Sequence, residues 1–271
     1  MMLWATKKKQ LREWNVRRVV FAIITAFATI AGLAGPALAE WPDKPVRLIV
    51  PYSAGGANDL LGRVFGDQLS KTFENKTGGG GMIANELAAR AAPDGYTLEV
   101  SGMPSLVLAP VMTKNNSVDP IKDYTHIAYL GGPPNVFVVH QSLGVNSFQE
   151  LLALMKREKD GVQYVSPNVG AVGNMVAEYV ADKEKVKLVH IAYRGGGSAI
   201  QDLVAGHVKV GSMTLSTTRP HILAGKLKAL AVSSEKRLPE FPDVPTLSEL
   251  GYPELVVTTW YSLSGPAGLP R

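Results

Sequence analysis

The stretch that decides the fold is residues 46–59, which read VRLIVPYSAGGAND. The first five residues are mostly apolar and β-branched and are stopped by Pro51, a pattern that predicts a buried strand. A glycine pair follows, and Asp59 then opens a run with apolar residues at helical spacing. The expected apolar face of this helix consists of Leu60, Leu61, Val64, Phe65 and Leu69.

Strand-like and helix-like runs continue to alternate along the chain, which predicts an α/β protein with helices on both faces of a parallel or mixed sheet. Two capping boxes, Ser147–Glu150 and Thr246–Glu249, mark expected helix starts. About nine strands are expected, which is many for one sheet, so we expect two lobes. Besides the first, the expected strands are 96–100, 124–130, 136–140, 162–166, 188–193, 208–213, 227–232 and 255–263.

The lobe boundaries are expected where this alternation changes character. The first lobe should cover residues 40–102, because a loop-rich stretch begins after Gly102. The second lobe should then run over 103–232. We expect the chain to return to the first lobe over 233–271, beginning with a proline-rich stretch.

Charge and composition exclude several classes of function. The chain has 28 Lys and Arg against 23 Asp and Glu, a formal net charge of +5. Residues 1–39 carry six of the basic residues and one acidic residue, so the remaining body is neutral. A neutral body without a basic block argues against a nucleic-acid partner. The absence of cysteine excludes disulfides, thiolate metal sites and cysteine nucleophiles.

Residues 1–39 have the layout of a secretory signal peptide. Lysines and arginines precede an apolar run from Val19 to Leu33, and Ala37-Leu38-Ala39 follows. The run has about 15 residues, whereas a membrane span needs about 20. We therefore expect export and cleavage before Glu40. An uncleaved anchor is the alternative, and Arg17-Arg18 leaves Sec or twin-arginine export open.

Polar or glycine-rich loops stand where open α/β sheets bind ligands, between strand ends and helix starts. Gly55 and Gly56 occupy such a loop, where backbone N–H groups and a helix N-terminus favour an anion. The alternative is that these glycines only make tight turns, but six comparable loops favour binding. The loops are 52–59, 77–81, 101–105, 166–174, 194–198 and 214–219.

Catalytic signatures are absent from the sequence. No P-loop, G-x-S-x-G or H-E-x-x-H motif occurs, and the five histidines lie singly. No pair of acidic residues stands out as a general acid and base. We therefore expect no enzyme, no catalytic residue, no metal and no cofactor, and interpret the chain as a binding protein.

Two sequence blocks carry a resemblance to a known family. Residues 51–59 read PYSAGGAND and residues 92–98 read APDGYTL. In this order they make the chain resemble the Bug family, the periplasmic solute-binding components of tripartite tricarboxylate transporters. Further matching segments are 41–50, 78–86, 89–91, 191–195, 220–232, 241–246, 260–261 and 265–268.

The resemblance implies a two-lobed, type II periplasmic-binding-protein fold that closes on its ligand. It implies a small carboxylate as ligand, membrane permease subunits as partners and the periplasm as location. Carried over by position, the first-lobe ligand residues are Tyr52, Ala54, Gly55, Gly56, Asp59, Gly79, Gly80, Ser101 and Met103. The second-lobe ligand residues are Asn168, Gly170, Ala171, Arg194, Gly195 and Thr214. For Asp59 we expect the role of N-cap and loop organiser.

The sequence also departs from the family pattern. Residues 73–77 replace a hydrophobic strand of the relatives, so we expect that edge strand to be lost or very short. Residues 167–173 carry few hydroxyl groups, which predicts a less polar pocket. The relatives run on into a further helical segment after the position of Arg271, so we expect a truncated member with an exposed apolar sheet face.

Two alternatives remain open at the sequence level. A protein that presents its ligand to a membrane receptor, without transport, would show the same residues. An enzyme acting on small organic acids could also use this fold, because fold does not fix function.

Overall fold

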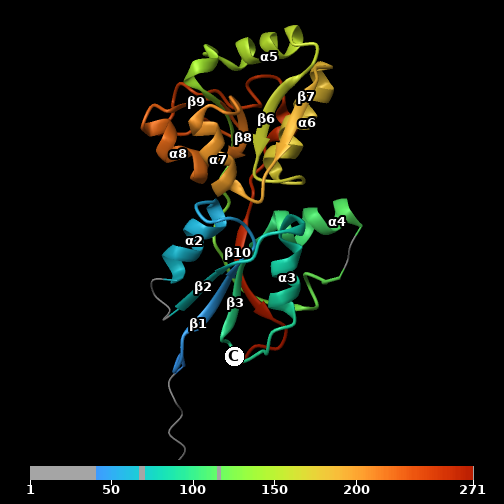
Figure 1. Cartoon of the computed structure of the whole chain (residues 1–271), viewed down its shortest axis with the longest axis vertical. Helices are drawn as coiled ribbons and strands as arrows, with labels where there is room; N and C mark the ends of the chain where they lie inside the picture. Colours follow the sequence, from blue (N-terminus) through green and yellow to red (C-terminus); the bar gives the residue numbers. More distant parts are fainter. Residues whose placement is uncertain (1–40, 67–70, 115–116, 271) are drawn as a thin grey trace, which may run out of the picture. The chain divides into compact units, whose positions relative to one another are not determined.

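Two mixed β-sheets, each flanked by helices, make up the described part of the protein (Figure 1). The structure is a computed structural model that describes residues 41–66, 71–114 and 117–270. Residues 44–271 form one compact unit. The expected signal peptide lies outside the described residues. No helix within the described ranges is long and apolar enough to span a bilayer.

The first sheet combines four strands that run in one direction with one that runs the opposite way. Its spatial order is β2 (Lys71–Asn75), β1 (Val46–Val50), β3 (Thr97–Gly102), β10 (Tyr261–Pro266) and β4 (Tyr124–Tyr129). β1 is parallel to β2 and β3, whereas β10 is antiparallel to β3 and β4. Two helical layers flank this sheet and bury its apolar side chains, α2 (Ala57–Gly66) on one face and α3 (Met82–Ala89) with η2 (Pro104–Leu108) on the other. Helix α4 (Ala109–Thr113) continues η2 directly.

The second sheet has the same number of strands and a helix pair on each face. Its spatial order is β7 (Leu188–Ala192), β6 (Val162–Ser166), β8 (Val210–Thr214), β5 (Asn135–His140) and β9 (Leu227–Val232). One apolar core lies under α5 (Phe148–Arg157) and α6 (Val172–Glu184), and the other under α7 (Gly196–Ala205) and α8 (Leu215–Leu223). The expected two-lobed α/β fold is therefore confirmed.

Strand pairing corrects the expected lobe boundaries. β4 follows Gly102 in the chain, yet it pairs with β10 in the first sheet, and the second sheet begins only with β5. Residues 233–257 do not return to the first sheet, because Leu247, Tyr252 and Leu255 pack in the core of the second. The partner of β4 comes from the far end of the chain, and no local pattern reveals such a pairing.

The expected loss of the edge strand is wrong. β2 pairs in parallel with β1 over five residues, from Val46 opposite Lys71 to Val50 opposite Asn75. Its sequence, KTFEN, has a single apolar side chain, so it carries no buried-strand pattern. An ion pair between Arg47 and Glu74 holds it to β1 instead, and Lys76 also contacts Glu74.

Helix α2 buries a different face from the one its apolar spacing predicts. The exposed fractions of Leu60 and Val64 are 41% and 66%. The buried positions are Ala57, Asn58, Asp59, Gly62 and Gly66. Gly62 explains this orientation, because a Cβ there would lie 3.3 Å from Val50 and 3.2 Å from Phe73. The small residue lets the helix approach the sheet closely.

The last third of the chain also differs from expectation in detail. The second capping box makes both reciprocal bonds, Glu249 N to Thr246 Oγ1 at 3.1 Å and Thr246 N to Glu249 at 2.7 Å, but in a turn rather than a helix. In place of the single strand expected over 255–263, the chain forms η4 (Pro253–Leu255), then an extended segment that crosses from the second sheet to the first, and then β10. This crossing brings residues 258–261 toward the first sheet.

Candidate functional site

A cavity lined by both lobes is the candidate ligand site. The space between its lining atoms, including the part that is open to solvent, is about 430 Å³. The first lobe and the crossing segment contribute Tyr52, Gly56, Ala57, Asn58, Pro104, Thr259 and Tyr261. The second lobe contributes Pro167, Asn168, Ala171, Val172, Gly173, Gly196, Thr214 and Thr217. None of these fifteen described residues is charged.

Four helices begin at this cavity. Ala57 is the first residue of α2, Val172 of α6 and Gly196 of α7, and Thr214 immediately precedes α8. The first N–H groups of a helix have no partner within the helix, and each N-terminus carries roughly half a positive charge. The cavity therefore attracts an anion without any basic side chain.

Three of these helix starts have no side-chain cap. The residues that precede α6, α7 and α8 make no side-chain hydrogen bond to the first turn; they are Ala171, Gly195 and Thr214. Two donors of these turns have partners from elsewhere, because Ser198 N donates to Ser53 Oγ and Leu215 N donates to Pro134 O. The other first-turn donors, above all those of α6, are available to a ligand that accepts hydrogen bonds.

The loop before α2 is organised by Asp59. Its carboxylate accepts a hydrogen bond from Gly55 N at 2.9 Å and from Asn75 at 3.2 Å, and it pairs with Arg63 at 2.8 Å. Burial tends to raise the pKa of Asp59, but Arg63, Gly55 and Asn75 together lower it below the ordinary value. Asp59 is the third residue of α2, so the expected N-cap position is wrong, whereas the loop contact is present.

The loop before α2 touches the start of α7 backbone to backbone. Ser53 N donates to Arg194 O at 3.2 Å, and Ser198 N donates to Ser53 Oγ at 3.3 Å. A Cβ on Gly197 would lie 1.7 Å from Ala54 O. Only glycine at position 197 permits this approach, so the glycine run at 195–197 sets how closely the two lobes meet.

A series of hydrogen bonds between polar side chains supports the second-lobe loop at residues 166–174. Gly170 N donates to Asn174 Oδ1 at 3.0 Å, and Asn174 donates to the hydroxyl of Tyr164 at 2.7 Å. Tyr164 in turn donates to Glu178 at 2.7 Å. Burial and Glu178 raise the pKa of Tyr164, so the phenol stays neutral and keeps these hydrogen bonds intact.

Tyr52 fixes the glycine-rich loop of the first lobe. Its hydroxyl donates to Gly80 O at 2.9 Å, and burial raises the pKa of the phenol. Gly80 has a φ of 67° and lies near the second lobe, because a Cβ added at Gly80 would be 4.0 Å from Asn168 Nδ2. The loop therefore borders the cavity without lining it.

The structure brings together some of the sequence-predicted site residues. Those that line the cavity are Tyr52, Gly56, Asn168, Ala171 and Thr214. The others support neighbouring loops or lie apart: Ala54, Gly55, Asp59, Gly79, Gly80, Ser101, Met103, Gly170, Arg194 and Gly195. The side chain of Arg194 is exposed, and Ser101 lies in the first sheet beside Ser262 at 3.1 Å.

Sequence reasoning missed ten lining residues. The missed residues with polar side chains are Asn58, Thr217, Thr259 and Tyr261. Thr259 and Tyr261 follow an apolar stretch and were predicted as one strand, so nothing local marked them as site residues. Their place in the cavity depends on the crossing between the two sheets.

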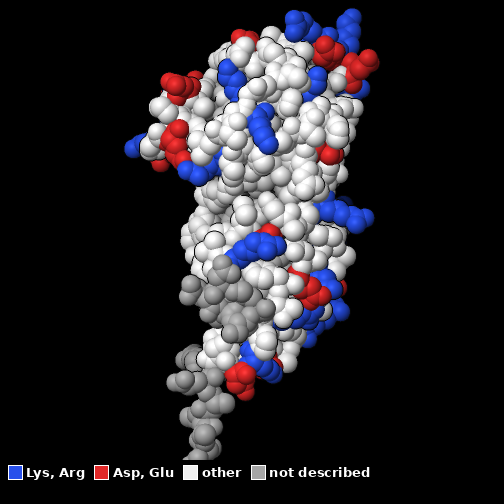
Figure 2. Space-filling view, turned by 60° about the vertical axis from the view of Figure 1, so that its left-hand side comes forward, with Lys and Arg blue, Asp and Glu red and all other residues white. Residues whose placement is uncertain are grey.

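The surface charges agree with a neutral body. On the face in Figure 2, lysine and arginine side chains are intermixed with aspartate and glutamate. No continuous basic area is visible on that face. Within the described residues, no group of three or more His, Asp or Glu side chains could hold a metal ion.

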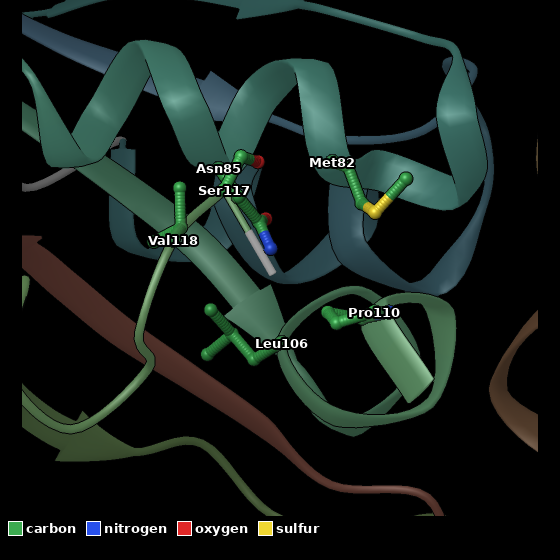
Figure 3. Close-up of a pocket in the computed structure, with 6 residues that line it drawn as sticks. All are labelled: Met82, Asn85, Leu106, Pro110, Ser117 and Val118. Atoms are coloured by element: carbon green, nitrogen blue, oxygen red, sulfur yellow. The ribbon is translucent and has the colours of Figure 1, made fainter. Parts of the chain in front are cut away.

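A second, smaller cavity lies within the first lobe (Figure 3). Its empty volume is about 230 Å³, and it is lined by Met82, Asn85, Leu106, Pro110, Ser117 and Val118. Asn85 Nδ2 donates to Ser105 O at 2.8 Å. The amide thus joins α3 to the helical segment after β3, next to the loop that Tyr52 contacts.

Comparison with known protein families matches residues 63–271 to the tripartite tricarboxylate transporter family receptor, TctC. The chain belongs to this family. BugT of Bordetella pertussis is 32% identical over 263 residues, which cover 94% of this chain and 80% of BugT.

Solved structures of TctC-like receptors share the fold. The periplasmic binding protein BugD superposes with a TM-score of 0.80 at 30% identity, covering 85% of this chain and 79% of BugD. MatC from Rhodopseudomonas palustris with bound malate gives a TM-score of 0.77 at 28% identity, covering 85% of this chain and 80% of MatC. This chain is thus a two-lobed solute-binding protein of the TctC family.

Proposed function

We propose that this chain captures a small carboxylate in the periplasm for a tripartite tricarboxylate-type transporter. One observation carries the proposal: four helix N-termini from both lobes converge on a single cavity that has no charged side chain. A carboxylate is the ligand that such backbone donors stabilise best. The malate bound by MatC is a ligand of this kind.

Ligand capture would proceed by lobe closure around the carboxylate. One helix N-terminus comes from the first lobe and three from the second. An anion in the cavity interacts with both groups only when the lobes are together. Its binding therefore favours the closed arrangement, in which Ser53 N meets Arg194 O.

Location and partners complete this proposal. The sequence of residues 1–39 supports export, with Glu40 as the mature N-terminus. Membrane permease subunits are the partners that the family implies. We propose no enzymatic step, because no nucleophile with a base lines the cavity. A receptor that presents the same ligand to a sensor would use the same site.

The test is a thermal-shift screen of the exported protein against small carboxylates. A ligand at a hundred times its Kd stabilises a protein by about 2.7 kcal/mol, which is a readily measured shift. Gly56→Val should abolish that shift, because a Cβ on Gly56 already lies 3.2 Å from Gly197 N. Ala92→Val is the control, since Ala92 is exposed and does not line the cavity. An unchanged shift in Gly56→Val would contradict the site.

A further inference from the structure

Thr259 carries a buried hydroxyl with no hydrogen-bond partner in the described structure. The exposed fraction of Thr259 is 4%, and its Oγ1 forms no hydrogen bond of ordinary geometry with a described residue, although it lies near enough to the hydroxyl of Tyr261 to lower the pKa of that phenol. Thr259 also lines the ligand cavity. A buried hydroxyl without a partner destabilises the protein, so a group that meets this hydroxyl in the cavity recovers that free energy.

Tyr261, two residues further along the chain, also lines the cavity and carries a second hydroxyl. Its exposed fraction is 3%. Burial raises the pKa of Tyr261 to about 12, with the hydroxyls of Thr214 and Thr259 acting in the opposite direction. The phenol is therefore protonated at any physiological pH. Thr259 and Tyr261 both lie on or next to β10, two residues apart.

This side of the cavity differs from the side formed by the helix starts. Thr259 belongs to the extended crossing and Tyr261 to a strand, so neither adds a helix dipole. With no cationic side chain among the lining residues, a second carboxylate here would lack a counter-charge. A ligand hydroxyl suits the position, because it both donates and accepts, as Thr259 and Tyr261 do.

We propose that Thr259 and Tyr261 form a hydroxyl-binding subsite, so that the receptor selects hydroxy acids over the same acids without the hydroxyl. This inference rests on the proposed carboxylate-binding function. The helix N-termini bind the carboxylate group of the ligand. Thr259 and Tyr261 bind its hydroxyl group and thereby set specificity.

The experiment compares two ligands that differ by one hydroxyl, malate and succinate, by calorimetric titration of the full exported chain. We expect the native protein to bind malate at least tenfold more tightly. Thr259→Val removes the hydroxyl at constant shape, and Tyr261→Phe removes the phenol oxygen. Each should bring the malate-to-succinate ratio close to one while leaving succinate affinity nearly unchanged.

Thr258→Val is the control, because Thr258 is the exposed neighbour of Thr259 and does not line the cavity. It should keep the native ratio. Thr259→Val should also melt no lower than the native protein without ligand, since it removes an unpartnered hydroxyl. A native ratio near one, or a ratio retained in both variants, would overturn the subsite. If neither malate nor succinate nor any other carboxylate binds, the proposed function itself fails, and the subsite fails with it.

Discussion

Helix α5 and the helices at the cavity begin in opposite ways. At α5, Ser147 Oγ accepts from Glu150 N at 3.2 Å, and Glu150 accepts from Asn146 N at 2.7 Å. This helix start is exposed to solvent and is closed by its own side chains. At α6, α7 and α8, the residue before the helix provides no side-chain cap. These three starts line the cavity, whereas α3 and α4, which also have no side-chain cap, begin outside it.

The difference shows which backbone donors the fold reserves for a ligand. A capping residue contributes about 1 kcal/mol to stability, so its absence at three helix starts has a cost. This cost in stability arises at helix starts where an anion can take the place of the cap. At α5 a side chain thus satisfies the backbone, and at the cavity a carboxylate is expected to satisfy it.

Glu99 tests this comparison most strongly. Its side chain is fully buried outside the cavity, and its Oε1 has no described hydrogen-bond partner. The hydroxyl of Tyr124 lies 2.8 Å from Asn85 O and 2.9 Å from Glu99 Oε2. A phenol has one proton, and the carbonyl can only accept it. Both contacts are hydrogen bonds at the same time only when the Glu99 carboxyl group is neutral and donates its own proton to Tyr124.

The largest expected effect follows from this protonation. Burial raises the pKa of Glu99 to about 8 from an ordinary value of 4.5. Between those values the folded state holds a proton that the unfolded state lacks. The free energy of unfolding should therefore fall by about 1.4 kcal/mol per pH unit as pH rises from 4.5 to 8.

Denaturant unfolding of the native protein and of Glu99→Gln across this range isolates the contribution of Glu99. The glutamine variant keeps a donor for Tyr124 and cannot titrate, so its stability should depend less on pH. Parallel curves for the two proteins would show that Glu99 is ionised in the folded state, and the hydrogen-bond argument would be wrong.

The next largest effect is expected at the contact between the lobes. Gly197→Ala introduces a Cβ that would lie 1.7 Å from Ala54 O, a clash that only separation of the loops relieves. Carboxylate affinity should fall about a hundredfold, or about 2.8 kcal/mol. Gln201→Ala is the control, because Gln201 is exposed on the same helix and does not line the cavity. Equal affinities of the two variants would mean that lobe closure does not need this contact.

The part of the site at residues 46–59 is predictable because its sequence pattern is local. The strand, the glycine pair and the helix lie within residues 46–59, and Tyr52 and Gly56 do line the cavity. The uncapped starts of α6 and α7 were also within predicted loops. Short-range sequence patterns identify such positions because strand ends and helix starts are themselves short-range features.

The remaining features depend on contacts between distant segments. β2 has almost no apolar residues and is a strand only because β1 offers it an edge and Arg47 pairs with Glu74. Leu60 and Val64 looked like a buried face, but Gly62 turns the helix the other way. Thr259 and Tyr261 enter the site through the crossing between sheets, which no local pattern shows.

A smaller effect should separate stability from binding. Ser147→Ala removes the cap of α5 and should lower the free energy of unfolding by about 1 kcal/mol. Carboxylate affinity should stay the same, because Ser147 lies away from the ligand cavity. Chemical denaturation and calorimetric titration of the same variant give both values. A parallel loss of affinity would show that α5 and the cavity are coupled.

The smallest effect is expected when a cavity helix is given the cap that it lacks. This change is also the most direct test of the comparison. Ala171 precedes α6 with φ −65° and ψ 154°, which a serine N-cap readily adopts. In Ala171→Ser the new hydroxyl can accept from the first turn of α6 and compete with a carboxylate for the same donors. The protein without ligand should melt slightly higher, while carboxylate affinity falls a few-fold. Ala92→Ser adds the same hydroxyl at an exposed position outside the cavity and serves as the composition control. If Ala171→Ser bound its carboxylate more tightly, the open N-terminus of α6 would not be a ligand donor, and the contrast with α5 would have no functional meaning.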